Sequence, residues 1–199
     1  TAEEFQFVRR AGGFMLNLDD ASMLPTIQRL GVPKFLSFRV NPGISQGGMK
    51  SLFLAGPDAK YGVPIKEAVA AYARAQAMGV RRFGIHAMTG SNVLDAAYFP
   101  AVAERLLALA TQLHRELGMA VERVNIGGGF GVPYRPEQHS LDLSVAAQGI
   151  RQVFDRYCGK NNLPEPILMA EPGRWIMADT AWLVGRVHVI KSAAKTFVG

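Results

Sequence analysis

The chain has 199 residues, of which 49% are apolar and 19% charged, and it carries a formal net charge of +6. This composition is typical of a globular domain large enough to bury one core. No apolar run reaches the roughly 18–20 residues that cross a membrane, and the basic residues are too scattered to indicate nucleic-acid binding. The single cysteine, Cys158, excludes an internal disulfide and is typical of a reducing, cytoplasmic compartment.

The first part of the chain predicts a helix followed by two strands. Thr1 and Glu4 form a capping-box pattern, which predicts a helix whose Phe5 and Val8 face the core. A helix at the first residue has nothing before it to pack on, so we expect further chain upstream. The next expected elements are a strand over 14–18, a helix over 19–30, a strand over 35–40 and a long loop over 44–60, a length often kept for function.

The second part alternates helices with strands. The expected elements are helices over 64–78, 98–117 and 143–157, strands over 82–86, 120–126 and 167–170, and an alternating apolar run over 182–190. Strands separated by helices run parallel through right-handed crossovers, so the pattern predicts an α/β fold. Two architectures remain open at this point: a doubly wound sheet, or part of a (β/α)₈ barrel.

Three consecutive glycines, Gly127, Gly128 and Gly129, follow the strand over 120–126 directly. Without Cβ atoms, a backbone can take positive φ and bring bare N–H groups close to an anion. A strand that ends in such a turn is how many α/β proteins hold a phosphate. The alternative is a flexible turn without a ligand.

Polar residues follow the carboxyl end of each predicted strand, which is the functional face of parallel α/β folds. They are Asn17 and Asp19, Arg39 and Asn41, the segment 86–92, the three glycines, and the segment 171–174. An open sheet gathers its site at one switch point, whereas a ring of polar strand ends favours the barrel.

Five motifs occur in an order and spacing that resemble the fold-type III pyridoxal-phosphate decarboxylases, nearest to diaminopimelate decarboxylase and its ornithine and arginine relatives. They are RVNPG at 39–43, KYGV at 60–63, GIHAMTGS at 84–91, NIGGGFG at 125–131 and EPGR at 171–174. The resemblance implies a (β/α)₈ barrel of the alanine racemase type, here strands four to eight. It assigns 1–180 to the barrel and 181–199 to the crossover into a C-terminal β-domain.

The resemblance also implies pyridoxal 5′-phosphate as cofactor and assigns roles to matching residues. The cofactor-binding set is Ser91, Gly127, Gly128, Gly129, Glu171, Gly173, Arg174 and Met88. Glu171 would face the pyridine nitrogen and keep it protonated, as a catalytic group. Arg174 would neutralise the phosphate or bind a substrate carboxylate, and Arg39 would lie nearby. An ordinary ion pair between Glu171 and Arg174 is the structural alternative.

Two features depart from the family pattern. The family places a second histidine two residues after the first, and here that position is Met88, whose thioether can pack on a ring but cannot donate a proton. His86 is a catalytic candidate, and the alternative is a structural histidine one layer deeper. No lysine stands in the family's first-strand motif, so we expect this chain to be a piece of a longer enzyme and inactive alone.

For the intact enzyme the resemblance implies decarboxylation of meso-diaminopimelate to L-lysine by a homodimer with shared sites and without a metal. The alternatives are a decarboxylase of ornithine, lysine or arginine, an amino-acid racemase, and a non-enzymatic cofactor carrier. A nucleotide-binding protein is disfavoured because Val132 and Pro133 follow the glycines and break the G-x-G-x-x-G pattern.

Overall fold

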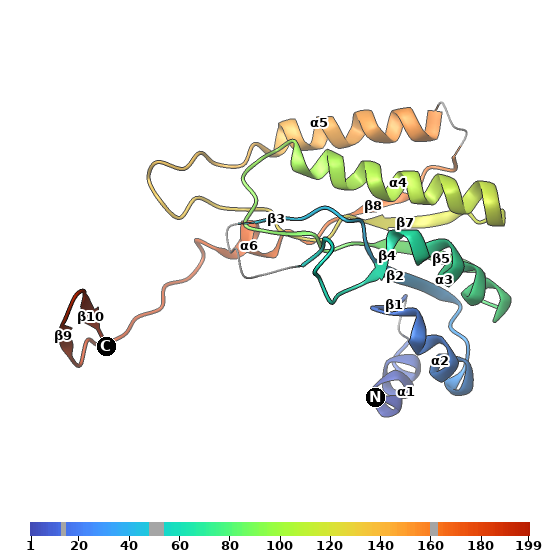
Figure 1. The fold of residues 1–199 in the computed structure, drawn as a ribbon, viewed down its shortest axis with the longest axis horizontal. Helices are drawn as coiled ribbons and strands as arrows, with labels where there is room; N and C mark the ends of the chain where they lie inside the picture. Colours follow the sequence, from blue (N-terminus) through green and yellow to red (C-terminus); the bar gives the residue numbers. More distant parts are fainter. Residues whose placement is uncertain (13–14, 48–53, 160–162) are drawn as a thin grey trace.

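The computed structural model describes residues 1–12, 15–47, 54–159 and 163–199 (Figure 1). Its main sheet contains six strands. They are β1 (Leu16–Leu18), β2 (Phe35–Asn41), β4 (Val63–Pro64), β5 (Arg82–His86), β7 (Val121–Asn125) and β8 (Ile167–Met169). Two short pairs lie apart from this sheet: β3 (Gln46–Gly47) with β6 (Gly90–Ser91), and β9 (Ile190–Ser192) with β10 (Thr196–Val198).

The strands of the main sheet are all parallel, in the order β1-β2-β5-β7-β8, with β4 extending the end of β2. Spatial order therefore follows chain order without a reversal. A doubly wound sheet reverses its order at a switch point, whereas a barrel does not. The arrangement confirms the predicted α/β fold with part of a barrel, because within the described residues β1 and β8 each pair with one strand only.

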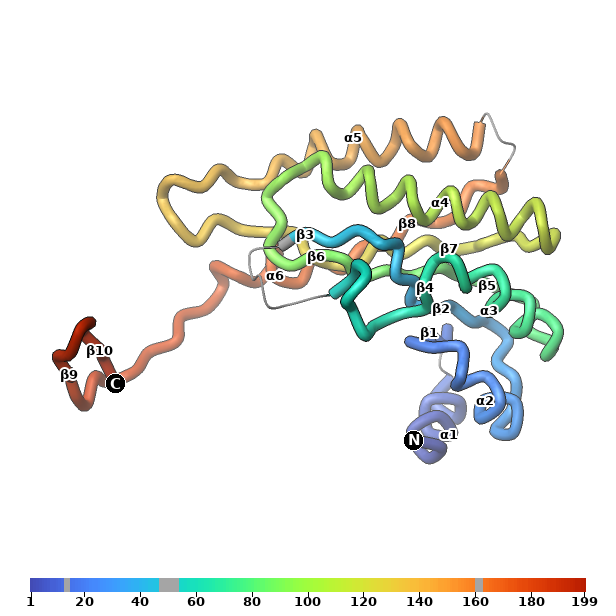
Figure 2. The backbone as a smooth tube through the Cα atoms, viewed as in Figure 1, coloured from blue at the N-terminus to red at the C-terminus, as the bar shows by residue number. Residues whose placement is uncertain are grey.

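Helices cover one face of this sheet (Figures 1 and 2). The α-helices are α1 (Ala2–Arg10), α2 (Leu24–Leu30), α3 (Ile65–Ala77), α4 (Tyr98–Leu117), α5 (Leu143–Phe154) and α6 (Gly173–Met177), with a 3₁₀ turn at Ala21–Met23 and a π-helical turn at Asp155–Gly159. The central helix α4 packs between α3 and α5 and buries an apolar stripe that includes Phe99, Leu106 and Leu113. Gly118 ends it in the left-handed conformation, φ 62°.

Tyr72 of α3 joins the helical layer to the sheet. Its hydroxyl donates to the Gly84 carbonyl oxygen at 2.6 Å and accepts from the Phe38 N–H at 3.3 Å. Gly84 lies where the pairing of β5 with β7 shifts register, so its carbonyl needs a partner from outside the ladder. Burial raises the pKa of the Tyr72 hydroxyl, which keeps the proton that it donates.

Tyr72→Phe is expected to lower the free energy of unfolding by about 1–3 kcal/mol, because it leaves two buried backbone groups without their partner. Chemical denaturation of both proteins measures this difference. Tyr134→Phe is the matched control, since the Tyr134 side chain is 66% exposed. Its expected change is below about 0.5 kcal/mol. Equal effects of the two substitutions would show that the buried Tyr72 hydroxyl does not stabilise the contact between α3 and the sheet.

The N-terminal prediction is confirmed in its cap and for Phe5, which is half-buried and packs against the core, but it is wrong for Val8. Thr1 and Glu4 form both hydrogen bonds of the capping box. None of the residues of α1 is buried, however, and Val8 is 49% exposed. The helix lies against α2 beyond β1, at the end of the sheet rather than over its face (Figure 1). Phe14, expected in the first strand, is outside the described residues.

The alternating run over 182–190 forms no regular strand before its last residue, Ile190, where β9 begins. The structure shows an extended segment that leaves α6 and leads to the β9–β10 hairpin away from the sheet (Figure 2). Trp182, Leu183 and Val184 are each about nine-tenths exposed or more. A strand needs a neighbour for its N–H and C=O groups, and among the described residues only the end of this run is paired, where His188 and Val189 donate to the Gly199 carbonyl oxygen.

Candidate cofactor site

The three glycines form the floor of the candidate site at the carboxyl end of β7. Gly127 and Gly129 have φ of +74° and +93°, conformations that side-chain-bearing residues rarely adopt. The turn also allows a close approach, since a Cβ at Gly127 would lie 2.1 Å from the Ala87 carbonyl oxygen, and one at Gly129 would lie 2.7 Å from that of Gly90. Only glycine therefore fits at these two positions.

Neighbouring segments hold this turn in place. Gly127 donates to Asn125 Oδ1 at 2.9 Å, and Val93 donates to the Gly129 carbonyl oxygen at 2.8 Å. The Phe130 ring stacks on Phe99 of α4, with ring centroids 4.1 Å apart and 9° between the planes. The turn is thus anchored on both sides, by hydrogen bonds to the 87–93 segment and by an aromatic contact to the helical layer.

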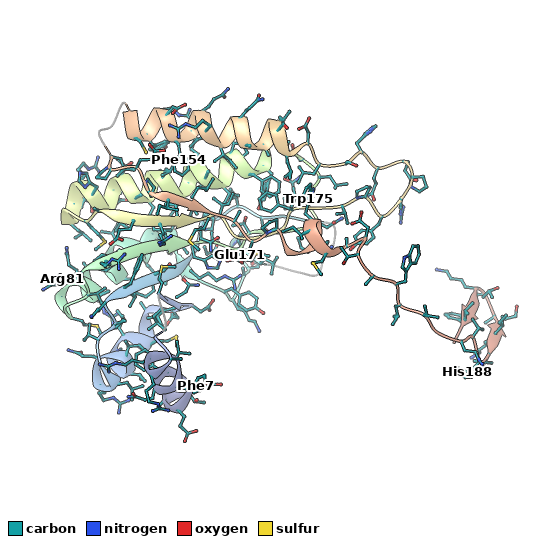
Figure 3. All side chains as sticks on the ribbon, turned by 180° about the vertical axis from the view of Figure 1, so that it is seen from behind. Phe7, Arg81, Phe154, Glu171, Trp175 and His188 are labelled. Atoms are coloured by element: carbon teal, nitrogen blue, oxygen red, sulfur yellow. The ribbon has the colours of Figure 1, made fainter. Side chains whose placement is uncertain are left out.

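Glu171 and the glycine turn lie side by side. The Glu171 N–H donates to the Gly127 carbonyl oxygen at 2.9 Å. A Cβ at Gly128 would come within 2.8 Å of the Glu171 carbonyl oxygen. Figure 3 shows Glu171 near the middle of the molecule, where β8 has ended, with Arg81 at the far end of the strands. The Glu171 side chain is half exposed.

Ser91 and Arg174 close the same corner. Arg174 Nη2 lies 3.4 Å from Ser91 Oγ and donates to it, which joins β6 to the start of α6. The guanidinium lies over the Tyr134 ring, 5.8 Å from its centroid. An arginine, a hydroxyl and glycine N–H groups gathered at one point suit a dianionic phosphate.

Gly128 and Met88 make a contact that the sequence did not reveal. The Gly128 N–H points at Met88 Sδ, with 3.3 Å between nitrogen and sulfur. Arg39 holds the same loop, because its Nη2 donates to the carbonyl oxygens of Leu54 and Met88 at 3.1 and 3.4 Å. A thioether is a weak acceptor, so an anion can displace it from this N–H at small cost.

The structure thus brings the predicted residues to one place, from the ends of β5, β7 and β8. Ser91, the three glycines, Gly173, Arg174, Glu171, His86 and Met88 all belong to this group of strand ends. Sequence reasoning missed the roles of Asn125, which orders the turn, and of Phe130, which anchors it. Both lie inside the NIGGGFG motif, so the motif was the only signal.

His86 is buried beneath this group and faces two carboxylates. Its Nε2 lies 3.4 Å from Glu171 Oε1, within ion-pair reach but outside hydrogen-bond geometry, and its Nδ1 lies 3.0 Å from Asn17 Nδ2. Burial is the largest influence and lowers the pKa of His86; Glu171 raises it, Arg39 lowers it and Asp19 raises it. At neutral pH the folded chain therefore holds His86 uncharged.

The free energy of unfolding is expected to fall as the pH drops below about 7. The unfolded chain protonates His86 near its ordinary pKa of about 6.5, while the folded chain does so only at lower pH. Between these two pKa values the unfolded state binds more protons, so stability falls by up to about 1.4 kcal/mol per pH unit. The loss levels off once folded His86 itself titrates.

Denaturation curves recorded from pH 7 to pH 5 measure this slope. His86→Gln is expected to flatten it, whereas His139→Gln, which replaces an exposed histidine, is expected to leave it unchanged. An identical slope in the parent and in His86→Gln would contradict the assignment of a neutral buried imidazole.

Two larger hollows lie elsewhere on the structure. An apolar one of about 770 Å³ lies between α5 and β8 and contains none of the predicted site residues. Another of about 790 Å³ adjoins the site and is lined by Tyr134, Leu141, Trp175 and Asp179, among others. We locate the site at the polar strand ends, because chemistry needs charged groups that converge. In the described part of the chain no three His, Cys, Asp or Glu residues could hold a metal ion.

Residues 1–178 match the family model of the pyridoxal-dependent decarboxylases, in its pyridoxal-binding domain. The chain belongs to this family. Diaminopimelate decarboxylase of Methanothermobacter thermautotrophicus is 34% identical over 198 residues, which are 99% of this chain and 46% of that protein. The present chain thus spans about half the length of the curated relatives that it matches.

Solved structures of the same family agree with the fold. The crystal structure of diaminopimelate decarboxylase from Helicobacter pylori complexed with L-lysine superposes with a TM-score of 0.83 at 25% identity, covering all of this chain and 49% of that one. Lysine decarboxylase from Selenomonas ruminantium superposes with a TM-score of 0.67 at 25% identity, over 85% of this chain and 41% of that one. The predicted alanine racemase-like barrel and the pyridoxal cofactor are therefore confirmed at the level of the family.

Proposed function

We propose that this chain is the cofactor-binding barrel of a pyridoxal-phosphate-dependent decarboxylase that converts meso-diaminopimelate to L-lysine and CO₂. The observation that carries the proposal is the convergence of the glycine turn, Ser91, Arg174 and Glu171 on one corner. Relatives at 34% and 32% identity named diaminopimelate decarboxylase support the substrate. No helix in the described ranges is long and apolar enough to cross a bilayer.

The residues present fit the cofactor phosphate. Because Asn125 already accepts from the Gly127 N–H, we assign Gly127 to turning the chain, and assign the donors for the phosphate to Gly128, Gly129 and Ser91. Arg174 adds a positive charge that balances the phosphate or a substrate carboxylate. Gly173, directly after Pro172 at the start of α6, lets the backbone pass close to the same anion.

Glu171 and Met88 fit the ring. The half-exposed Glu171 carboxylate would accept a hydrogen bond from the protonated pyridine nitrogen, which holds the proton there. Met88 would lie against the ring face, where a thioether contributes packing without charge. When bound, the cofactor supplies an electron sink for the pair released as the carboxylate leaves. The chain's own task is to hold charge at the ring nitrogen and at the phosphate while it fixes the ring's orientation.

Three further parts of the proposal come from the family resemblance, and a fourth comes from the single cysteine. Residues 1–180 form the barrel and 181–199 lead into a β-domain, the lysine that holds the cofactor lies elsewhere in the whole protein, and two copies share their sites. The exposed apolar run that includes Trp182 and Leu183 is consistent with a segment that packs on another domain. A cytoplasmic location is proposed from the absence of disulfide-forming pairs.

A second candidate is a decarboxylase of lysine, ornithine or arginine, favoured by the likeness to lysine decarboxylase from Selenomonas ruminantium and by Met88 at the usual histidine position. Release of CO₂ by the whole protein should be measured with meso-diaminopimelate and with the L and D forms of these diamino acids. We expect CO₂ and L-lysine from meso-diaminopimelate. Racemisation without CO₂, or cofactor binding without turnover of any substrate, would overturn the assignment.

A further inference from the structure

A chain of polar side chains crosses the inside of the open barrel. Asn17 lies in β1, His86 in β5 and Asn125 in β7. Glu171 follows the end of β8. Asn17 Nδ2 lies 3.0 Å from His86 Nδ1, His86 Nε2 lies 3.4 Å from Glu171 Oε1, and Asn125 Nδ2 donates to the same oxygen at 2.8 Å. The contacts pass over β2 and link the two outer strands of the sheet.

The contact between Asn17 and His86 determines which imidazole nitrogen carries the proton. With the Asn17 NH₂ group toward the ring, as this contact has it, His86 Nδ1 accepts from Asn17 and carries no proton. A neutral imidazole then carries its proton on Nε2, the nitrogen that faces Glu171. Asn125 presents a second N–H to the same carboxylate oxygen. Glu171 Oε1 therefore accepts one hydrogen bond, from Asn125, and lies within electrostatic range of the His86 N–H, while Oε2 remains for the cofactor.

The surroundings favour a neutral imidazole. His86 is 9% exposed, and the charged side chains that face it are Glu171, Asp19 and Arg39. Arg39 Nη1 lies 3.7 Å from Asp19 Oδ1, so these two largely offset each other. What remains beside His86 is the Glu171 carboxylate, 3.4 Å from Nε2, which a neutral imidazole N–H attracts as a dipole without neutralising its charge.

We propose that Asn17 and His86 are a positioning pair for Glu171: Asn17 selects the Nε2–H tautomer of His86, which turns and holds the carboxylate as an anion toward the ring nitrogen. The proposal rests on the proposed function, which gives Glu171 its partner. A triad uses the same logic when a buried acid sets the tautomer of a histidine. Here an amide sets it, and the histidine acts on a carboxylate rather than on a nucleophile.

The tautomer is tested by long-range ¹⁵N–¹H correlation spectra of the protein with ¹⁵N-labelled histidine and without cofactor. His86→Gln assigns the signal by its loss, and His86→Asn serves if that variant does not fold. We expect the Nε2–H pattern in the parent and mixed tautomers in Asn17→Leu. Asn17→Asp keeps the size but replaces the donor with an acceptor, so we expect imidazolium at neutral pH. A parent with Nδ1–H, or no change in either variant, would overturn the pairing.

The link to Glu171 is tested by steady-state kinetics of the whole protein. Both Asn17 variants are expected to lower kcat by about 10-fold, the lower range for loss of an orienting partner, with KM unchanged. A rise in KM of about 10-fold with unchanged kcat would indicate a merely structural role for Asn17 and would overturn its link to Glu171. If the parent binds no cofactor, the proposed function fails, whereas the spectra recorded without cofactor still judge the Asn17–His86 pair on its own.

Discussion

Glu171→Gln is expected to lower kcat of the whole protein about 10²- to 10³-fold, the range measured when a group that stabilises transition-state charge is removed. The amide cannot hold a proton on the pyridine nitrogen, so the ring takes up electrons less readily. Its size is unchanged, and the Asn125 contact at 2.8 Å can be kept by the amide oxygen. Cofactor affinity should change far less than kcat, because the phosphate contacts remain.

Glu165→Gln is the matched control on the same strand. Glu165 precedes β8 and Glu171 follows it, so the two carboxylates lie at opposite ends of three strand residues. Glu165 pairs with Arg151 at 2.8 Å on the surface, where solvent weakens such a contact. We expect unchanged kcat for this control. A Glu171→Gln enzyme that keeps the kcat of the control would remove Glu171 from the chemistry.

Gly127→Ala is expected to destabilise the fold by about 2–5 kcal/mol and to abolish cofactor binding. The new Cβ would lie 2.1 Å from the Ala87 carbonyl oxygen, so the turn and the 87–93 segment must separate. Overpacking of this kind typically costs about 1–3 kcal/mol, and a positive φ adds about 1–2 kcal/mol. Chemical denaturation and a titration with pyridoxal phosphate measure the two effects.

Gly79→Ala separates backbone strain from the close contact. Gly79 has φ +104°, and a Cβ there would meet no atom within 4 Å. Only the conformational cost of about 1–2 kcal/mol is expected, with cofactor binding intact. Equal destabilisation by both alanines, together with cofactor binding by Gly127→Ala, would mean that the close approach at Ala87 is not what shapes the turn.

Elements with a strong local signal were predictable from the sequence. The helix α4, the capping box of α1 and the glycines after β7 each follow from residues within one element. The location of the site also followed, because parallel strands place their carboxyl ends together whatever their register. The glycine turn, Ser91 and Glu171 lie together for this reason.

Contacts between distant side chains could not be predicted. Asn17 contacts His86 across β2, and Gly128 contacts Met88 Sδ. Both contacts depend on the register of the parallel strands, which the sequence does not show. The sequence marked Asn17 only as a polar strand end. The same limit applies to the run over 182–190, because alternation alone does not reveal whether a segment has the neighbour on which strand structure depends.

A crystal structure of the protein with pyridoxal 5′-phosphate tests the central claim most directly. We predict a phosphate that accepts from Gly128 and Gly129, lies beside Ser91 and Arg174, and displaces the Met88 thioether, with the pyridine nitrogen facing Glu171. A phosphate bound away from residues 127–131, or a ring nitrogen that meets no carboxylate, would contradict the assignment of this corner to the cofactor.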